Sequence, residues 1–173
     1  SRKLLKRLHQ AISIGNAIDV QATLHEGADA NGPLAISENS TVATTPLCRA
    51  VTAEQLLIVR LLLEHQTTDV NKQQSDGRTA LFLAVQNGNL ECVRLLLEAR
   101  ASVDIPAVQK QGQTWTCHSI AKRMWSKDQT RCAQLLALLD GSRPVVPPRT
   151  SLSPAGDQAS DSSDDICSND EAS

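Results

Sequence analysis

The sequence contains very few aromatic residues, and their scarcity limits the kinds of partner the chain can bind. Tyrosine is absent, and two tryptophans and one phenylalanine bring the aromatic share to 2%. Proteins that bind single-stranded nucleic acid depend on stacking bases against aromatic rings. We therefore expect no nucleic-acid partner. The hydrophobic residues are chiefly Leu, Val and Ala, which favours a thin helical stack over a large globular core.

Long apolar runs are also lacking, as are paired cysteines. No stretch approaches the roughly 20 apolar residues that cross a membrane, and no signal peptide is evident, so we expect no membrane partner. The five cysteines form no Cys-x-x-Cys pair, and Cys48 and Cys92 fall on expected helix positions. An odd count without such a pair is typical of reduced thiols. It predicts a cytoplasmic or nuclear protein.

Patterns that carry catalysis or bind metals are missing too. The glycines fall in expected turns rather than in a phosphate-binding loop, and no histidine has a second ligand at metal spacing. Cys117 and His118 are neighbours, so on a helix their side chains point in different directions. A buried thiol and a surface imidazole are expected there, rather than a nucleophile and its base. We predict no enzymatic activity, with no catalytic residue, cofactor or metal.

What the sequence does contain is a pair of short helices over residues 76–98. Thr79 suits the start of the first helix, because its hydroxyl can accept from backbone N–H groups one turn later. Gly88 can end that helix in the left-handed conformation. The apolar residues fall at helical spacing: Leu81, Ala84 and Val85, then Leu90, Val93, Leu96 and Leu97. Neither helix is long enough to be stable alone, so the unit must stack on copies of itself.

Copies of this unit recur at a spacing near 33 residues. Upstream, the Ala84, Gly88, Val93, Leu96 and Leu97 pattern is matched by Ala50, Val59, Leu62 and Leu63, and before that by Ala11, Gly15, Val20, Thr23 and Leu24. Downstream it is matched by Thr116, Ile120, Ala121, Leu135 and Leu136, with about two extra residues between the helices. Self-similarity at a fixed spacing of this size predicts a solenoid.

The copies resemble the ankyrin repeat, which begins Thr-Pro-Leu-His-x-Ala and exits through Gly-Ala-Asp-x-Asn. The start stands here as residues 45–50, Thr-Pro-Leu-Cys-Arg-Ala, and the exit as residues 27–31, Gly-Ala-Asp-Ala-Asn. The resemblance implies an all-α solenoid of about four helix-turn-helix repeats joined by hairpin loops. The repeats are expected at about residues 4–31, 45–71, 79–104 and 114–140, within a domain covering residues 1–140.

Departures from the repeat pattern lead to further expectations. The family histidine that tightens the turn is replaced by Cys48 and Phe82, at a cost on the order of 1 kcal/mol for each lost hydrogen bond. Phe82 is then expected to be partly exposed on the inner face. In the last repeat, either Thr114 or Thr116 could cap the first helix, while Trp115 and Trp125 are expected to cover the open end of the stack.

The resemblance also implies a non-enzymatic protein-interaction module, whose partner contacts the hairpin tips and the concave face. Arg78 is the leading candidate, since arginine is enriched at binding hot spots. The full set of candidate contact residues is Gln73, Ser75, Asp76, Arg78, Phe82, Gln86, Asn87 and Thr52. The alternative for each of them is ordinary solvated surface. We expect a monomer that binds a protein whose identity the sequence does not give.

Beyond residue 140 the composition changes. Residues 150–173 contain six acidic and no basic residues, and the Ser-, Asp- and Pro-rich segment 141–173 is predicted to be a disordered acidic tail. Pro144, Pro147 and Arg149 match the Pro-x-x-Pro-x-Arg pattern that SH3 domains bind, although such a pattern is also common in linkers. Ser153, Ser162 and Ser168 match proline-directed or acid-directed phosphorylation patterns.

An alternative interpretation concerns the context of the repeats. Residues 44–51, Thr-Thr-Pro-Leu-Cys-Arg-Ala-Val, and residues 119–123, Ser-Ile-Ala-Lys-Arg, are similar to the ankyrin segments of Arf GTPase-activating proteins. The chain would then be the ankyrin segment of a multidomain signalling regulator. The catalytic zinc finger of such a protein is not present in this chain.

Overall fold

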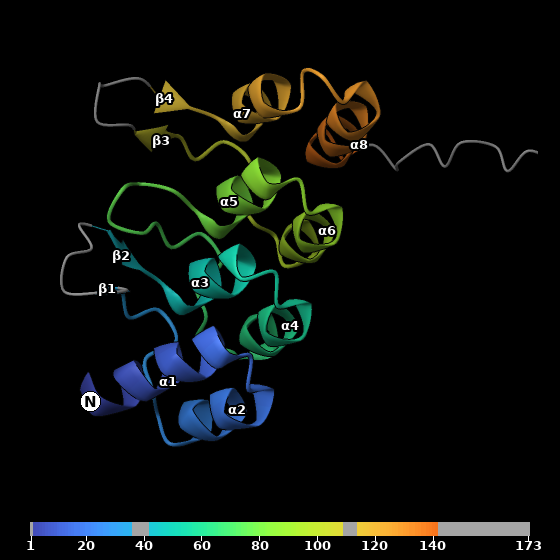
Figure 1. The fold of residues 1–173 in the computed structure, drawn as a ribbon. Coiled ribbons are helices and arrows are strands. Elements are labelled where there is room, and N and C mark those ends of the chain that lie inside the picture. The colour runs from blue at the N-terminus through green and yellow to red at the C-terminus, as the bar shows by residue number, and fades with distance from the viewer. Residues whose placement is uncertain (1, 36–41, 109–113, 142–173) are drawn as a thin grey trace, which may run out of the picture.

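The computed structural model describes residues 2–35, 42–108 and 114–141, and within them four helix pairs stack in chain order (Figure 1). The first helices of the pairs are α1 (Arg2–Ile14), α3 (Pro46–Thr52), α5 (Ala80–Asn87) and α7 (Cys117–Met124). The second helices are α2 (Ala17–His25), α4 (Leu56–Glu64), α6 (Leu90–Glu98) and α8 (Gln129–Leu139). The predicted helical repeat solenoid is confirmed.

The longer connections between repeats form short antiparallel strand pairs. Strand β1 (Leu34–Ala35) pairs with β2 (Ala43–Thr44), with Leu34 opposite Thr44. Strand β3 (Ala107–Val108) pairs with β4 (Thr114–Trp115), with Ala107 opposite Trp115. Both pairs project from the same side of the stack as fingers (Figure 1). The helical class therefore stands, with strands confined to these fingers among the described residues.

The helices lie in two rows, and each helix packs on its counterpart in the next repeat. One row runs α1, α3, α5, α7, and the other runs α2, α4, α6, α8. The fingers lie beyond the first row (Figure 1). The fingers and the first row together bound the inner face, whereas the second row forms the outer face.

Threonine caps explain where three of the first-row helices begin. The Thr79 hydroxyl accepts from the Phe82 N–H at 3.2 Å, as predicted, and Thr45 caps α3 in the same way. In the last repeat the cap is Thr116, which exchanges hydrogen bonds with Ser119 in a capping box. Thr114 lies in strand β4 instead. The choice between the two threonines left open by the sequence is thus resolved.

Left-handed residues follow three of the four first-row helices, α1, α3 and α5. Gly88 ends α5 with φ +70° and Gly15 follows α1 with φ +82°. The second repeat has Glu54 where a glycine is usual, and Glu54 adopts φ +56°. A side chain in this conformation costs roughly 1–2 kcal/mol. The turn geometry is therefore kept even where the sequence lacks the residue that favours it.

The interior is formed by apolar side chains from both rows, and it is most complete in the third repeat. Helix α5 contacts α3, α6 and α7, and six consecutive α5 residues from Ala80 to Val85 are buried. The prediction that Phe82 is partly exposed is therefore wrong, because its side chain is only 2% exposed. Packing on several sides of α5 removes Phe82 from the surface that a partner could reach.

The two tryptophans do not both cover the end of the stack. The Trp125 ring lies against Gly88, and its Nε1 donates to the Val85 carbonyl at 3.0 Å. Trp125 therefore fills the junction between the third and fourth repeats, which corrects the prediction for this residue. Trp115 lies in β4, half-buried, with the Arg123 guanidinium 4.6 Å from its ring centroid.

Asparagine side chains connect neighbouring repeats at their exits. Asn31 donates from Nδ2 to the Thr67 carbonyl at 2.6 Å and accepts from the Asp69 N–H at 2.7 Å. Asn71 repeats part of this arrangement by accepting from the Ser102 N–H at 2.7 Å. These bonds satisfy backbone groups of the next repeat. They fix the spacing of the loops that connect the repeats.

Candidate protein-binding surface

The hairpin at residues 72–78 is a compact turn that places its residues on the finger side of the stack. The Gln74 N–H donates to the Arg78 carbonyl at 2.9 Å, and the Gly77 N–H donates to the Gln74 carbonyl at 2.9 Å. Gly77 supplies the left-handed φ of +79° that the turn requires. The Asp76 carboxylate accepts from the Arg78 N–H at 3.1 Å. Asp76 and Arg78 are thereby held on one side of the turn.

The structure brings three of the candidate residues into one network. The Nε atom of Arg78 lies 2.9 Å from an Asp76 carboxylate oxygen, and Nη1 of Arg78 donates to Gln86 Oε1 at 3.4 Å. The Arg78 side chain is 33% exposed. A guanidinium has five N–H donors, so these two contacts leave donors for a partner. Arg78 is thus both oriented in advance and accessible.

Gln73 and Ser75 have a different role, because the neighbouring fingers engage them. The Ser75 hydroxyl accepts from the Ala43 N–H at 2.8 Å, and the Ser75 N–H donates to the Ala43 carbonyl at 3.1 Å. The Gln73 side-chain amide donates to the carbonyls of Gly77 at 2.8 Å and Pro106 at 3.2 Å. The hairpin is therefore tied to the fingers before and after it. The hairpin and the two fingers therefore form one continuous surface.

Thr52, Gln86 and Asn87 lie near the ends of the first-row helices. Thr52 and Gln86 occupy equivalent positions of α3 and α5, one repeat apart. The Thr52 hydroxyl donates to the Cys48 carbonyl at 2.8 Å. Thr52 is exposed, and Asn87 is half-buried. These residues continue the inner face away from the hairpin, whereas the buried Phe82 does not contribute to it.

Three cysteines of the described residues, Cys48, Cys92 and Cys117, are buried as free thiols. Burial raises the pKa of the Cys117 thiol to about 11. The same cause raises the pKa of Cys48 and of Cys92 to about 11, so all three thiols stay protonated near neutral pH. His118 contacts Asp140 at 2.8 Å rather than pairing with Cys117. Among the described residues no His, Cys, Asp and Glu side chains gather as a metal-binding group.

Several predictions concern residues outside the part of the chain that the structure describes. They are the disorder of the acidic tail after residue 141, the SH3 ligand at Pro144, Pro147 and Arg149, and the phosphorylation of Ser153, Ser162 and Ser168. In the ranges 2–35, 42–108 and 114–141, no helix is both long and apolar enough to cross a membrane.

Stacked helix pairs with a surface of connected fingers define a repeat solenoid of the protein-interaction class. The family described as ankyrin repeats (3 copies) matches residues 8–109. The chain therefore belongs to the ankyrin repeat family, whose repeats serve as protein-interaction modules.

Individual relatives match a shorter stretch. Cortactin-binding protein 2 of Dasypus novemcinctus is 38% identical over 60 residues, which are 35% of this chain and 4% of that protein. The Equus caballus protein of the same name is 40% identical over 60 residues, with the same shares covered. The Rattus norvegicus protein is 38% identical over 73 residues, 42% of this chain and 4% of the relative. The chain thus spans only a small part of these relatives, and none of the three is an Arf GTPase-activating protein.

Proposed function

We propose that residues 1–140 bind a protein partner through the hairpin tips and the adjoining inner face, with residues 141–173 as an appended acidic segment. The observation that carries this proposal is Arg78, which Asp76 and Gln86 hold at the edge between the hairpin and α5. Holding a side chain in place before binding lowers the entropic cost of association. Thr52 and Asn87 extend the same surface, while Gln73 and Ser75 keep the fingers in position.

The proposal includes the setting in which the module works. We propose that it acts as a monomer. We also propose that it works in the cytoplasm or nucleus, a setting supported by Cys48, Cys92 and Cys117, which are buried as free thiols. The relatives described above are named as binding cortactin, so cortactin is a reasonable first protein to test. The Pro144 to Arg149 segment is a separate proposed ligand for an SH3 domain.

Charge reversal at Arg78 tests the main proposal. Arg78→Glu places a second carboxyl group beside that of Asp76 at the hairpin. We expect it to lower affinity for the partner by at least tenfold, the loss typical of a hot-spot arginine. The measurement is cross-linking mass spectrometry of the tagged chain in cell lysate, followed by binding assays with each protein it identifies, cortactin included. Circular dichroism verifies that the variant is folded.

The matched control is Arg94→Glu, which makes the same charge change on the exposed side of α6 in the outer row. It is expected to leave the set of cross-linked proteins unchanged. If Arg78→Glu and Arg94→Glu behave alike, the partner surface does not include Arg78. If the wild-type chain shows no saturable protein partner, the proposed function itself is wrong.

A further inference from the structure

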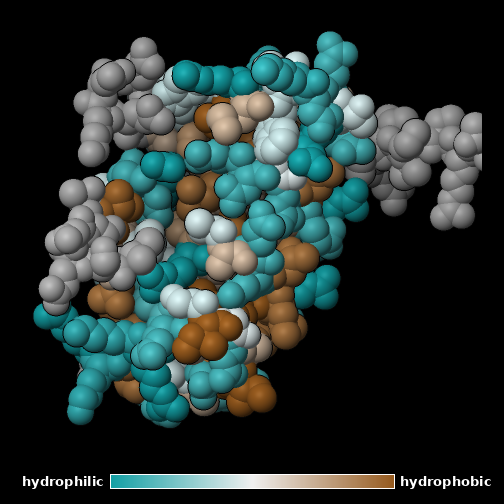
Figure 2. Space-filling view, in the orientation of Figure 1, coloured by the Kyte–Doolittle hydropathy of each residue, from teal (hydrophilic) through white to brown (hydrophobic). Residues whose placement is uncertain are grey.

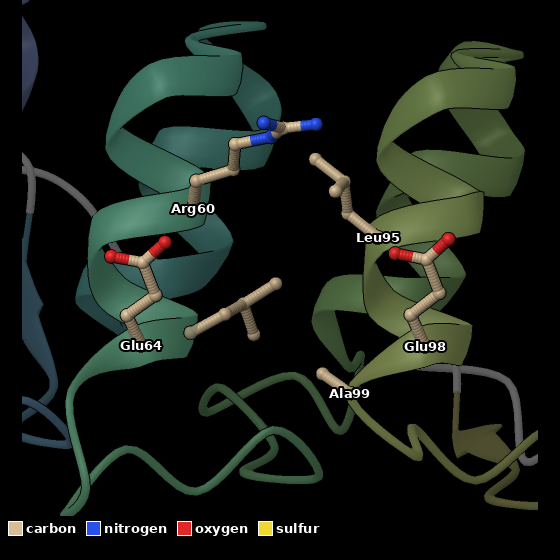
Figure 3. Close-up of a pocket in the computed structure, with 6 residues that line it drawn as sticks. Arg60, Glu64, Leu95, Glu98 and Ala99 are labelled. Carbon is tan, nitrogen blue, oxygen red and sulfur yellow. The ribbon is translucent and has the colours of Figure 1, made fainter.

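The outer face carries a groove that the finger surface does not involve. Helices α4 and α6 contain the same six-residue run, Val-Arg-Leu-Leu-Leu-Glu, at residues 59–64 and 93–98. The groove between them has a volume of about 360 Å³, and Figure 3 shows the residues that line it: Arg60, Leu63, Glu64, Leu95, Glu98 and Ala99. The half-buried Leu63, Leu95 and Ala99 supply apolar surface, and the three charged residues are exposed.

One end of the groove concentrates negative charge. Glu64 and Glu98 are the last residues of α4 and α6, and neither helix has a basic residue in its last turn. Helix C-termini carry a partial negative charge from their free carbonyl groups. Among the described residues, neither glutamate has a cation within salt-bridge distance. In Figure 3 the two carboxylates lie on facing helices, while Arg60 extends from α4 toward α6 at another level of the groove.

The neighbouring helix pairs of the outer row do not repeat this pair of glutamates at the same register position. Glu64 and Glu98 each follow a leucine of the repeat pattern, Leu63 and Leu97. The residues that follow the equivalent leucines are His25 in α2 and Ala137 in α8. At this position the pair α2 and α4 therefore has a histidine and Glu64, and the pair α6 and α8 has Glu98 and an alanine. At this register position of the described second-row helices, the pair α4 and α6 is the one with a glutamate on both helices.

We propose that the groove between α4 and α6 binds an arginine side chain of a protein partner. The aliphatic part of the arginine packs on Leu63 and Leu95, and its guanidinium lies between Glu64 and Glu98. A planar guanidinium presents N–H donors on more than one edge, so it can serve carboxylates on two walls better than a compact ammonium group. Arg60 lies at another level of the groove, and its positive charge repels the guanidinium of the bound arginine there. The bound arginine is therefore confined to the end of the groove that carries Glu64 and Glu98.

The test uses NMR titration of the ¹⁵N-labelled full chain with acetyl-Leu-Arg-Leu-amide and with its neutral isostere, acetyl-Leu-citrulline-Leu-amide. The arginine peptide is expected to cause saturable shifts in the last turns of α4 and α6. The citrulline peptide is expected to bind about fivefold more weakly, the change that corresponds to about 1 kcal/mol of exposed ion pairing.

The double variant Glu64→Gln, Glu98→Gln should weaken binding of the arginine peptide by roughly fivefold or more, for the same reason. Glu91→Gln removes an exposed carboxylate at the other end of α6 and should leave the affinity unchanged. Equal binding of both peptides, full binding by the double variant, or shifts that map elsewhere would overturn the proposal. Arg78→Glu should leave this titration unaffected, so failure of the groove and failure of the finger surface can be told apart.

Discussion

Replacing Gly88 with alanine is expected to lower the free energy of unfolding by about 3 kcal/mol, the largest effect we anticipate for any single methyl group in this chain. An alanine Cβ at this position would overlap Cζ2 of the Trp125 ring. Inserting a group into packed surroundings costs about 1–3 kcal/mol. The φ of +70° adds about 1–2 kcal/mol for any residue with a side chain.

The Trp125 ring has little freedom to move aside. Its Nε1 donates to the Val85 carbonyl at 3.0 Å, and the Arg131 guanidinium lies 4.9 Å from the ring centroid on one face. The Gly88 N–H donates to the same Val85 carbonyl at 3.1 Å. A shift of the ring large enough to admit a methyl group would therefore break the bond that joins the third and fourth repeats.

Urea denaturation followed by circular dichroism measures the effect, and Gly27→Ala provides the matched control. Gly27 has a φ of +84°, but no atom lies within 4 Å of the Cβ position. Its replacement should cost only the backbone term, about 1–2 kcal/mol. Combining Gly88→Ala with Trp125→Ala should recover part of the packing cost. Equal losses for the two glycine variants would show that the ring does not determine the cost at Gly88.

Much of the repeat architecture could be predicted because it depends on local chemistry. Thr79 caps α5 and Gly88 ends it, as their positions relative to the apolar stripe indicated. The residues at equivalent positions of the neighbouring copies predicted the order of the helices. Caps, turns and helical periodicity act within one or two turns of the chain, so they can be recognised without knowing what packs against them.

Exposure could not be predicted equally well, since it depends on elements far away in the sequence. Phe82 occupies a position expected on the inner face, yet it is buried in α5, a helix that packs against α3, α6 and α7. The sequence predicts Trp125 at the end of the stack, but its ring packs against Gly88, which lies 37 positions earlier in the sequence. In both cases the outcome depends on how one repeat meets the next.

The candidate site likewise contains local contacts that the sequence predicts and long-range contacts that it does not. The proximity of Asp76, Arg78 and Gln86 follows from a hairpin leading directly into a helix, and the sequence placed all three on one surface. The engagement of Gln73 by Pro106 and of Ser75 by Ala43 requires the fingers to be aligned across more than 30 residues of sequence. No periodicity or motif carries that information.

Acidification should destabilise the chain through His9, the second large effect that we expect. His9 is 1% exposed, and its Nε2 lies 3.1 Å from the Gly32 carbonyl while its Nδ1 lies 3.4 Å from Nη1 of Arg49. A neutral ring with its proton on Nε2 satisfies both contacts, because Nε2 then donates and Nδ1 accepts. Burial, with the Arg49 charge as a smaller cause, lowers the pKa of His9 from 6.5 to about 4.

Because the pKa of His9 is lower in the folded chain than in the unfolded chain, the unfolded chain binds the additional proton first as the pH falls. Stability is unaffected by His9 above about pH 6.5 and declines between about pH 6.5 and 4. The expected loss is about 2 kcal/mol at pH 5 and about 3 kcal/mol at pH 4. Urea denaturation at pH 7 and pH 5 measures it in a range where few carboxylates titrate.

Two variants separate His9 from the other histidines. His9→Gln should be less stable than the wild-type chain at pH 7, because glutamine cannot reproduce both contacts, but it should lose about 2 kcal/mol less between pH 7 and pH 5. His25→Gln, which alters an exposed histidine, should keep the wild-type dependence. If the His9→Gln chain remains as sensitive to pH as the wild type, the decline has another source. If its sensitivity disappears, the junction of the first two repeats, where Arg49 and Gly32 meet His9, is the part of the stack that acid destabilises.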